Sequence, residues 1–268
     1  NLLRELKIQT RKLALALKVK GFLNIQFAIK KDEIFVIEVN PRASRTVPFV
    51  SKANGVPLAK IASRIMAGKK LGKYNLKYQT NKTFAVKEAV FPFNKFPDSD
   101  VLLGPEMKST GEVMGFDDDF GMAYAKSQIA ASNSLPTKGL AFLSVKDSHK
   151  SEIIDLAKQL LKLNFNLCGT NGTANAIRDK GIKCKKINKV SGGTPHIVDV
   201  LNSKKIALVI NTGGGKRKHR LSDARALRRS TLINKVPYCT NMSTAYACLE
   251  AIKSLKNKKL KVKSLQEN

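Results

Sequence analysis

The sequence of 268 residues contains no tryptophan, three histidines and four cysteines, and no apolar run long enough to cross a membrane. The cysteines show no Cys-x-x-Cys spacing, and so few histidines complete no zinc-binding pattern. These absences argue against a zinc module and a membrane span. We expect reduced, buried thiols, as in a cytoplasmic protein. The length leaves room for two domains.

Acidic residues are also scarce, because 20 Asp and Glu stand against 49 Lys and Arg, giving a formal net charge of +29. Such a charge is typical of nucleic-acid-binding proteins. The cationic residues are mostly lysines scattered along the chain, without interleaved aromatics or a zinc-finger or RNA-binding signature. A lysine bias of solvated surfaces therefore explains the charge better. A basic nucleic-acid-binding protein is kept as an alternative, whose DNA affinity would fall steeply with salt.

A polar motif spreads over two segments, 24–30 and 34–40, in which polar and apolar residues alternate as in half-buried strands. Gln26 lies on the polar face of the first segment, and Glu38 and Asn40 share a face of the second. One carboxylate flanked by two amide oxygens suits a hard divalent cation such as Mg²⁺. An ordinary surface hairpin is the alternative, and it suffices for Glu38 taken alone.

The turn between the two segments decides whether these side chains meet. If residues 31–33 form a three-residue loop, Lys30 pairs with Ile34 and Gln26 lies opposite Glu38. A two-residue loop would place them on opposite faces, because a slip of one residue reverses every side chain. We expect the longer loop. Two arginines, Arg42 and Arg45, follow the second segment, and guanidinium groups match phosphate oxygens.

Beyond a linker at 132–137, strands and helices alternate strictly. Strands are expected at 141–145, 165–168, 185–187, 206–210 and 236–239, and helices at 148–163, 173–180, 195–201, 221–233 and 243–254. This pattern predicts an α/β fold with an open, mostly parallel, doubly wound sheet, in which ligands bind beyond the carboxyl ends of the strands. The first half is less regular, with a helix expected at 2–18, a strand at 83–93 and a helix at 120–131.

Candidate phosphate-binding residues follow the expected strand ends: Lys150, Thr170, Thr173, Lys189 and the segment that begins at Asn211. Free backbone N–H groups at a helix N-terminus, hydroxyls and lysines together favour an anionic, phosphorylated metabolite. Each residue alone could be a helix cap or part of a loose loop, so the prediction depends on their convergence at one edge. The basic run at 216–220 is suited to the same phosphate.

The stretch 21–71, with NIQFA, IEVNPRASRTVPFVSKANGVPLAK and RIMAGKKL, resembles the end of an ATP-grasp domain of the carbamoyl-phosphate synthetase large subunit. In that family the residues matching Gln26, Glu38 and Asn40 hold Mg²⁺ or Mn²⁺ against the ATP phosphates, and the arginine matching Arg42 lies beside them. The resemblance implies a part of an ATP-grasp ligase that phosphorylates carbamate to carbamoyl phosphate for arginine and pyrimidine biosynthesis. Its expected partner is the glutaminase small subunit, and the heterodimer could itself oligomerise.

Residues 138–255 resemble the regulatory domain of the same subunit, which has a methylglyoxal-synthase-like fold and binds nucleotide monophosphates such as UMP or IMP. The ligand positions match Lys150, Thr170, Thr173, Lys189 and Asn211. The sequence departs from the family pattern at Asn171, where histidine is common, and at Gly213, which replaces a hydroxyl. Methylglyoxal synthase itself uses an Asp where this sequence has Thr194, so regulation is favoured over catalysis.

The resemblance also matches Glu88 with a carboxylate that contacts the activator ornithine, and Thr240 with a second ornithine contact. We therefore expect three regions: 1–75 as the C-terminal part of an ATP-grasp domain, 76–137 as the remainder of the synthetase unit and a linker, and 138–268 as an allosteric domain that folds alone. Without the earlier ATP-grasp segments, this fragment alone should be inactive. A nucleotide-sensing module without catalysis is the alternative.

Overall fold

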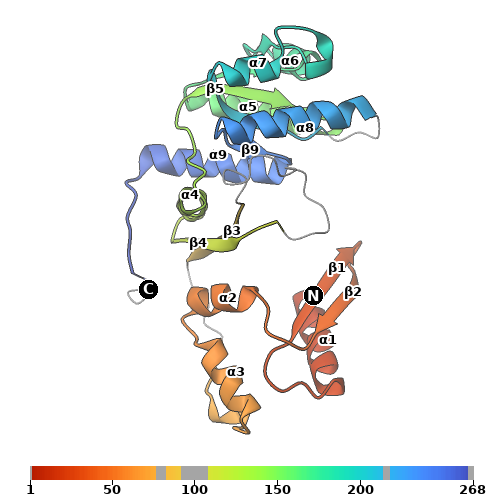
Figure 1. Cartoon of the computed structure of the whole chain (residues 1–268), viewed down its shortest axis with the longest axis vertical. Coiled ribbons are helices and arrows are strands. Elements are labelled where there is room, and N and C mark those ends of the chain that lie inside the picture. The colour runs from red at the N-terminus through yellow and green to blue at the C-terminus, as the bar shows by residue number, and fades with distance from the viewer. Residues whose placement is uncertain (1, 77–82, 92–107, 214–217, 265–268) are drawn as a thin grey trace. The chain divides into compact units, whose positions relative to one another are not determined.

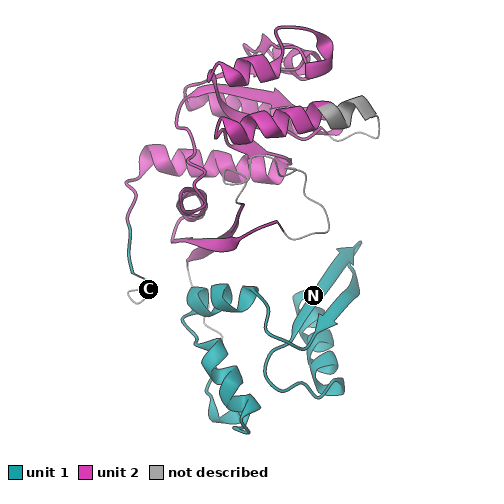
Figure 2. Ribbon diagram, viewed as in Figure 1, with its two compact units in different colours: residues 1–81, 262–268 teal, residues 82–261 magenta. Residues whose placement is uncertain are grey.

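The computed structural model describes residues 2–76, 83–91, 108–213 and 218–264, with the side chains of 218–222 excepted (Figure 1). The chain divides into two compact units, residues 1–81 with 262–268, and residues 82–261 (Figure 2). The basic run predicted to serve a phosphate, 216–220, lies outside the described residues and side chains. Within the described part of the chain, no helix is both long and apolar enough to span a membrane.

The described residues of the first unit form three α-helices, one short 3-10 helix and one hairpin. They are α1 (Leu2–Ala16), β1 (Asn24–Lys30), β2 (Glu33–Asn40), α2 (Thr46–Asn54), α3 (Leu58–Met66) and η1 (Leu71–Lys73). The predicted first helix is confirmed, although it ends two residues earlier, and Lys18 has a positive φ of 50°. Helices α2 and α3 were not predicted; Gly55, in the left-handed conformation with φ 65°, separates them.

The β1–β2 hairpin has a different turn from the predicted one. Lys30 pairs with Glu33, so the loop consists of Lys31 and Asp32 alone, with φ values of 49° and 66°. Positive φ at both central residues is typical of a type I′ turn, for which Asn-Gly or Asp-Gly is the usual signature. Lys-Asp lacks that signature, which is why the sequence suggested a longer loop. The predicted three-residue turn is therefore wrong.

The predicted pairing of Gln26 with Glu38 is nevertheless confirmed. The register shifts between Gln26 and Phe27, because Phe27 pairs with Val36 while Gln26 pairs with Glu38. Ile37 is thus the extra residue of a β-bulge, which returns Glu38 to the face it would have lost through the shorter turn.

The second unit begins with two antiparallel strands and a helix: β3 (Phe84–Val90), β4 (Gly111–Asp117) and α4 (Phe120–Ala130). The predicted strand at 83–93 and helix at 120–131 correspond to β3 and α4, although residues 92 and 93 lie outside the described chain. Strand β4 was not predicted. Asp119 begins α4 as its N-cap and accepts a hydrogen bond from the Met122 N–H at 2.8 Å.

The remaining elements alternate along the chain: β5 (Gly139–Ser144), η2 (Asp147–His149), α5 (Lys150–Lys162), β6 (Phe165–Gly169), α6 (Asn171–Arg178), β7 (Lys185–Lys186), η3 (Val190–Gly192), α7 (Ile197–Asn202), β8 (Ile206–Asn211), α8 (Lys218–Ile233), β9 (Tyr238–Cys239) and α9 (Met242–Asn257). The strands form a sheet in the order β7-β6-β5-β8-β9, and every pairing is parallel. The predicted α/β fold with an open, parallel, doubly wound sheet is confirmed.

Successive residues of the central strands point into two separate cores. In β5, Ala141 and Leu143 pack on one side with α5, α6 and α9, whereas Phe142 packs on the other side with α7 and α8. In β8, Leu208 and Ile210 pack in the first core and Val209 in the second. Both faces of the sheet are therefore buried, as the apolar strands of a parallel sheet require.

Helix α4 packs against α9 and against β3 and β4, so these elements join the five-stranded sheet in one compact unit (Figures 1 and 2). Six residues of α4 are buried: Gly121, Met122, Ala123, Ala125, Ser127 and Gln128. The predicted region boundaries at 75 and 137 stay predictions, but α4, which precedes the second boundary, packs on α9, which follows it.

Candidate functional site

A cavity of about 250 Å³ lies at the carboxyl ends of β5, β6 and β8. From β5 the chain runs outward through β6 to β7 and then crosses to β8 on the other side of β5. Such a reversal of strand order is where ligands bind in open α/β sheets. The five residues predicted to contact a nucleotide all line this cavity, namely Lys150, Thr170, Thr173, Lys189 and Asn211. The predicted convergence of these residues on one edge is therefore present in the structure.

One wall of the cavity is the turn from β6 into α6. Thr170 is the N-cap residue of α6, and its hydroxyl lies 3.2 Å from the Ser144 hydroxyl of β5. The Thr173 hydroxyl accepts a hydrogen bond from the Val145 N–H at 3.0 Å. Both threonines are buried. These bonds fix the N-terminus of α6, with its free N–H groups, against the end of β5.

Two lysines supply positive charge to the cavity. Lys150 forms an ion pair with Asp147 at 2.8 Å, and a Cβ added at Gly172 in the first turn of α6 would lie 3.9 Å from its Nζ. Lys189 lines the cavity at the start of η3, and its side chain is exposed. Asp223 of α8 also lines the cavity and accepts a hydrogen bond from the Ser191 hydroxyl at 2.7 Å.

Both polar atoms of the side-chain amide of Asn211, at the end of β8, form hydrogen bonds within the chain. Its Nδ2 donates to the Tyr238 hydroxyl at 3.0 Å, and its Oδ1 accepts from the Gly213 N–H at 3.1 Å. The next residue, Thr212, is buried, and its hydroxyl lies 3.0 Å from Nδ1 of His149. The end of β8 is therefore held by β9 and by the loop after β5.

Sequence reasoning missed four of these residues: Asp147, His149, Asp223 and Tyr238. The first two lie between a predicted strand and a predicted helix, so their place at the strand ends could have been inferred. The contacts of Asp223 and Tyr238 depend on packing between distant segments.

The hairpin gathers the second group of predicted residues. Gln26 is paired with Glu38, and the Asn40 side-chain amide donates to Glu38 Oε1 at 2.9 Å. Gln26 and Glu38 are exposed and Asn40 is half-buried. One carboxylate and two amides on one face are oxygen donors of the kind that Mg²⁺ and Mn²⁺ accept, so the residues fit such an ion. Arg42 is exposed, and its Nη1 donates to the Ala43 carbonyl at 3.2 Å.

The predicted activator contacts, Glu88 and Thr240, lie in the second unit. The Glu88 carboxylate accepts a hydrogen bond from the Gln128 amide of α4 at 2.8 Å. Burial raises the pKa of Glu88, and this effect exceeds the lowering by the Gln128 hydrogen bond. Burial also raises the pKa of Tyr124, with smaller contributions from the nearby Cys248, Cys239 and Glu88. Thr240 directly follows Cys239 and is exposed.

Two family models match the chain. Residues 1–74 match the carbamoyl-phosphate synthase L chain, ATP binding domain, and residues 152–240 match the MGS-like domain. The predicted combination of a partial ATP-grasp region with a methylglyoxal-synthase-like domain is confirmed.

Curated relatives match along the whole chain. The C-terminal section of the carbamoyl phosphate synthase large chain of Aquifex aeolicus is 48% identical over 99% of this chain and 53% of its own length. The large chain of Mesorhizobium japonicum is 49% identical over 99% of this chain and 23% of its own. This chain thus spans about half, or about a quarter, of the relatives it matches.

Among solved structures, a methylglyoxal synthase from Elizabethkingia anophelis aligns with 43% of this chain and 79% of its own, with 19% identity and a TM-score of 0.34. The whole-chain matches carry the family assignment instead: the chain corresponds to the C-terminal section of the carbamoyl phosphate synthase large chain.

Proposed function

We propose that this chain, as the C-terminal section of a carbamoyl phosphate synthase large chain, completes an ATP site with its hairpin and binds a nucleotide monophosphate in its strand-end cavity. One observation carries the second part of this proposal. Five residues chosen from the sequence as phosphate and nucleotide contacts, spread over more than 60 positions, line a single cavity.

In the ATP site, Gln26, Glu38 and Asn40 would hold Mg²⁺ or Mn²⁺. When bound, the ion would neutralise phosphate charge, which is the main requirement of phosphoryl transfer. The chain's own contribution is to keep three oxygen-bearing side chains on one face of a two-stranded ladder. Arg42, two residues after Asn40, would place a guanidinium beside the phosphates.

The intact protein would phosphorylate carbamate to carbamoyl phosphate with ATP, for arginine and pyrimidine biosynthesis in the cytoplasm. A glutaminase small subunit would supply ammonia. This section alone should be inactive, because it spans 53% of one matched relative and 23% of another.

In the cavity, the phosphate of UMP or IMP would sit at the N-terminus of α6. Thr170 and Thr173 would offer hydroxyls there, and Lys150 and Lys189, which line the same cavity, would supply positive charge. Charge-assisted hydrogen bonds of this kind are roughly twice as strong as neutral ones. Asn211 would contact the nucleoside only after exchanging one of its two bonds within the chain.

A cationic activator such as ornithine would bind at Glu88, with Thr240 as a second contact. The support is a carboxylate that is partly buried and, among the described residues, is held by the neutral amide of Gln128 rather than by a lysine or arginine. A cationic ligand would interact favourably with such a carboxylate, because the cation would stabilise the negative charge that burial disfavours. A nucleotide-sensing module without catalysis is the second candidate, and the preserved hairpin set argues against it.

Calorimetry on the full chain with UMP, IMP and uridine tests the proposal. We expect UMP or IMP to bind and uridine to bind at least about tenfold more weakly, because the nucleoside lacks the phosphate. Equal affinities for nucleotide and nucleoside would contradict a phosphate site. Absence of binding by all three would remove the regulatory role and leave the hairpin proposal to be tested separately.

A further inference from the structure

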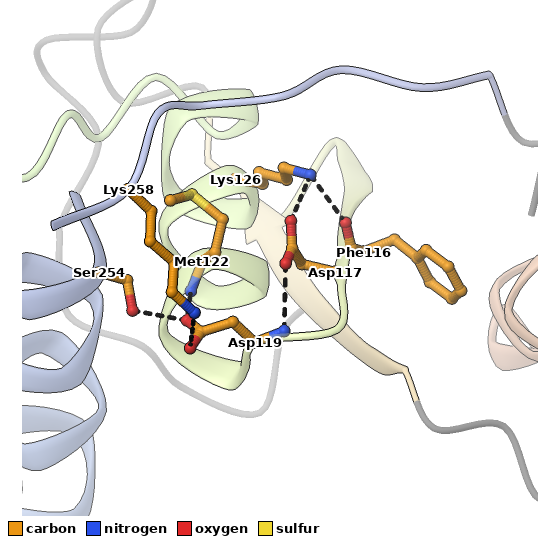
Figure 3. A network of polar contacts seen from close by, with 7 residues as sticks. All are labelled: Phe116, Asp117, Asp119, Met122, Lys126, Ser254 and Lys258. Atoms are coloured by element: carbon orange, nitrogen blue, oxygen red, sulfur yellow. Dashed lines mark hydrogen bonds and ion pairs between the residues drawn. The ribbon is translucent and has the colours of Figure 1, made fainter.

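The carboxylate of Asp119 ties the beginning of α4 to the end of α9 (Figure 3). Its Oδ1 accepts hydrogen bonds from the Met122 N–H at 2.8 Å and from the Ser254 hydroxyl at 2.5 Å. Its Oδ2 forms an ion pair with Lys258 at 2.8 Å. Both oxygens are therefore occupied, one of them by the helix that Asp119 caps. We call Asp119, Ser254 and Lys258 the clasp.

Two glycines allow α4 to approach its neighbours on both sides. A Cβ added at Gly121 would lie 2.4 Å from the Glu250 carbonyl of α9, and a Cβ at Gly115 of β4 would lie 1.9 Å from the Ala123 carbonyl of α4. Neither distance is compatible with a side chain. Backbones in such close contact cannot shift independently, so a displacement of α4 relative to α9 must also displace the β3–β4 pair.

The other end of α4 holds Glu88. Gln128 lies nine residues after Asp119, about 13 Å along the helix axis. It is 8% exposed, and its amide donates to the Glu88 carboxylate at 2.8 Å. A further contact fixes the middle of α4, because Lys126 forms an ion pair with Asp117 of β4 at 2.7 Å (Figure 3). The helix thus connects the end of α9 to the strand that carries Glu88.

We propose that Asp119 is a positioning residue, which clasps α4 to α9 and so holds Gln128 against the Glu88 carboxylate. The proposal rests on the proposed function only in naming Glu88 as a contact for a cationic ligand. The proposal predicts that breaking the clasp changes the surroundings of the Glu88 carboxylate of β3, at the other end of α4, in addition to lowering the stability of the fold.

The groups near Glu88 make its titration a suitable measure. Tyr124 of α4 is close enough to interact with Glu88, and burial keeps that tyrosine neutral by raising its pKa. On the neighbouring strand positions, Lys87 is paired with Glu112 at 3.3 Å. Burial raises the pKa of Glu88 and the Gln128 hydrogen bond lowers it, so a displacement of α4 that changes either one changes that pKa.

The test is carbon-detected NMR titration of the glutamate carboxyls and the Gln128 amide in the full chain. We expect Asp119→Asn to shift the Glu88 midpoint and the Gln128 side-chain signals, because both the burial of Glu88 and its hydrogen bond from Gln128 depend on the position of α4. Asp118→Asn, which removes the same charge from an exposed neighbour, should leave both unchanged. An unchanged Glu88 midpoint together with unchanged Gln128 signals in Asp119→Asn, with a lower melting temperature, would show that the clasp is only structural and would overturn the proposal.

A second pair of variants covers the case in which Asp119→Asn does not fold. Lys258→Gln removes the ion pair but keeps the helix cap, and Lys259→Gln is its matched control. The first should produce smaller shifts of the Glu88 midpoint and of the Gln128 signals, and the second none. Equal midpoints and equal Gln128 signals in the two would overturn the proposal. Titration of the parent chain with L-ornithine is a separate arm: if the midpoints move as expected but ornithine does not bind, the activator role fails and the positioning role stands.

Discussion

Gln26 and Glu38 lie directly opposite each other in the β1–β2 ladder because Ile37 bulges out of it. The Ile37 side chain is 64% exposed. Without the bulge, the two-residue turn would pair Gln26 with Ile37 and put Glu38 on the other face. The proposed metal ligands therefore depend on one extra residue in β2, and Asn40, two positions after Glu38, shares the face that the bulge restores.

Glu38→Ala should strongly reduce carbamoyl phosphate formation by the full-length enzyme. Removing the one carboxylate among the proposed ligands costs several kcal/mol of charge stabilisation, roughly a thousandfold in rate. Glu33→Ala is the control, because Glu33 is an exposed residue of the same strand. Turnover is measured with both variants and their melting temperatures are compared with the parent. Near-normal turnover of Glu38→Ala would refute the metal role.

Lys189→Ala should weaken UMP binding by roughly 10- to 150-fold, because one charge-assisted hydrogen bond to an anion contributes roughly 1.5–3 kcal/mol. Lys185→Ala is the matched control: Lys185 lies four residues earlier, is exposed, and does not line the cavity. Calorimetry on the two variants separates a local contact from a general effect of positive charge. Equal losses of affinity would indicate that net charge, rather than Lys189, attracts the nucleotide.

A fragment of residues 82–268 should be more stable than one of residues 138–268. The shorter fragment lacks α4, which packs on α9 and has Met122, Ala123 and Ala125 among its buried residues. Without that helix, α9 would expose apolar surface and favour aggregation. Thermal melts give the melting temperatures of the two fragments, and size-exclusion chromatography shows whether each is monomeric or aggregated. Equal melting temperatures and monomeric behaviour would support the boundary expected at 138.

The alternating second half of the chain could be predicted because its signals are local. Each strand there is a short apolar run and each helix an amphipathic one, so the parallel sheet and the polar residues at its strand ends followed from the order of the elements. The place of Lys150, Thr170 and Thr173 in one cavity is a consequence of that topology.

The parts that were missed depend on contacts between distant residues or on unusual local conformations. Lys31 and Asp32 adopt positive φ without the expected Asn-Gly sequence. Strand β4, Gly111–Asp117, contains two glycines, which weaken a strand signal. The hydrogen bond between Gln128 and Glu88 joins residues 40 positions apart, and no local pattern predicts it.

The clasp should stabilise the fold at neutral pH but not in strong acid. The hydrogen bonds and ion pair to Lys258 and Ser254 lower the pKa of Asp119 from 3.8 to about 2. A lowered carboxyl pKa stabilises the folded state above the ordinary value, and this contribution is lost as the pH falls from about 4 to 2. Asp119→Asn should therefore lower the melting temperature at pH 7, and the difference from the parent should shrink toward pH 2. A difference independent of pH would mean that the charge of Asp119 does not contribute.

Gly115→Ala should destabilise the protein much more than Gly111→Ala, although both residues lie in β4. A Cβ at Gly115 would lie 1.9 Å from the Ala123 carbonyl and 2.5 Å from the Ser127 nitrogen, both in the backbone of α4, whereas a Cβ at Gly111 would have no neighbour within 4 Å among the described residues. Backbone atoms cannot rotate away as a flexible side chain can, so α4 would have to move off β4.

Overpacking of this kind typically costs about 1–3 kcal/mol, and the cost should be at the upper end here because the same helix is held on its other side by Gly121 against α9. Chemical denaturation of the two variants gives the free energies of unfolding. Similar values would mean that β4 and α4 can separate without cost, and α4 could not then hold Glu88 in a fixed place relative to α9. A large loss confined to Gly115→Ala would show that β4, α4 and α9 move as one packed stack.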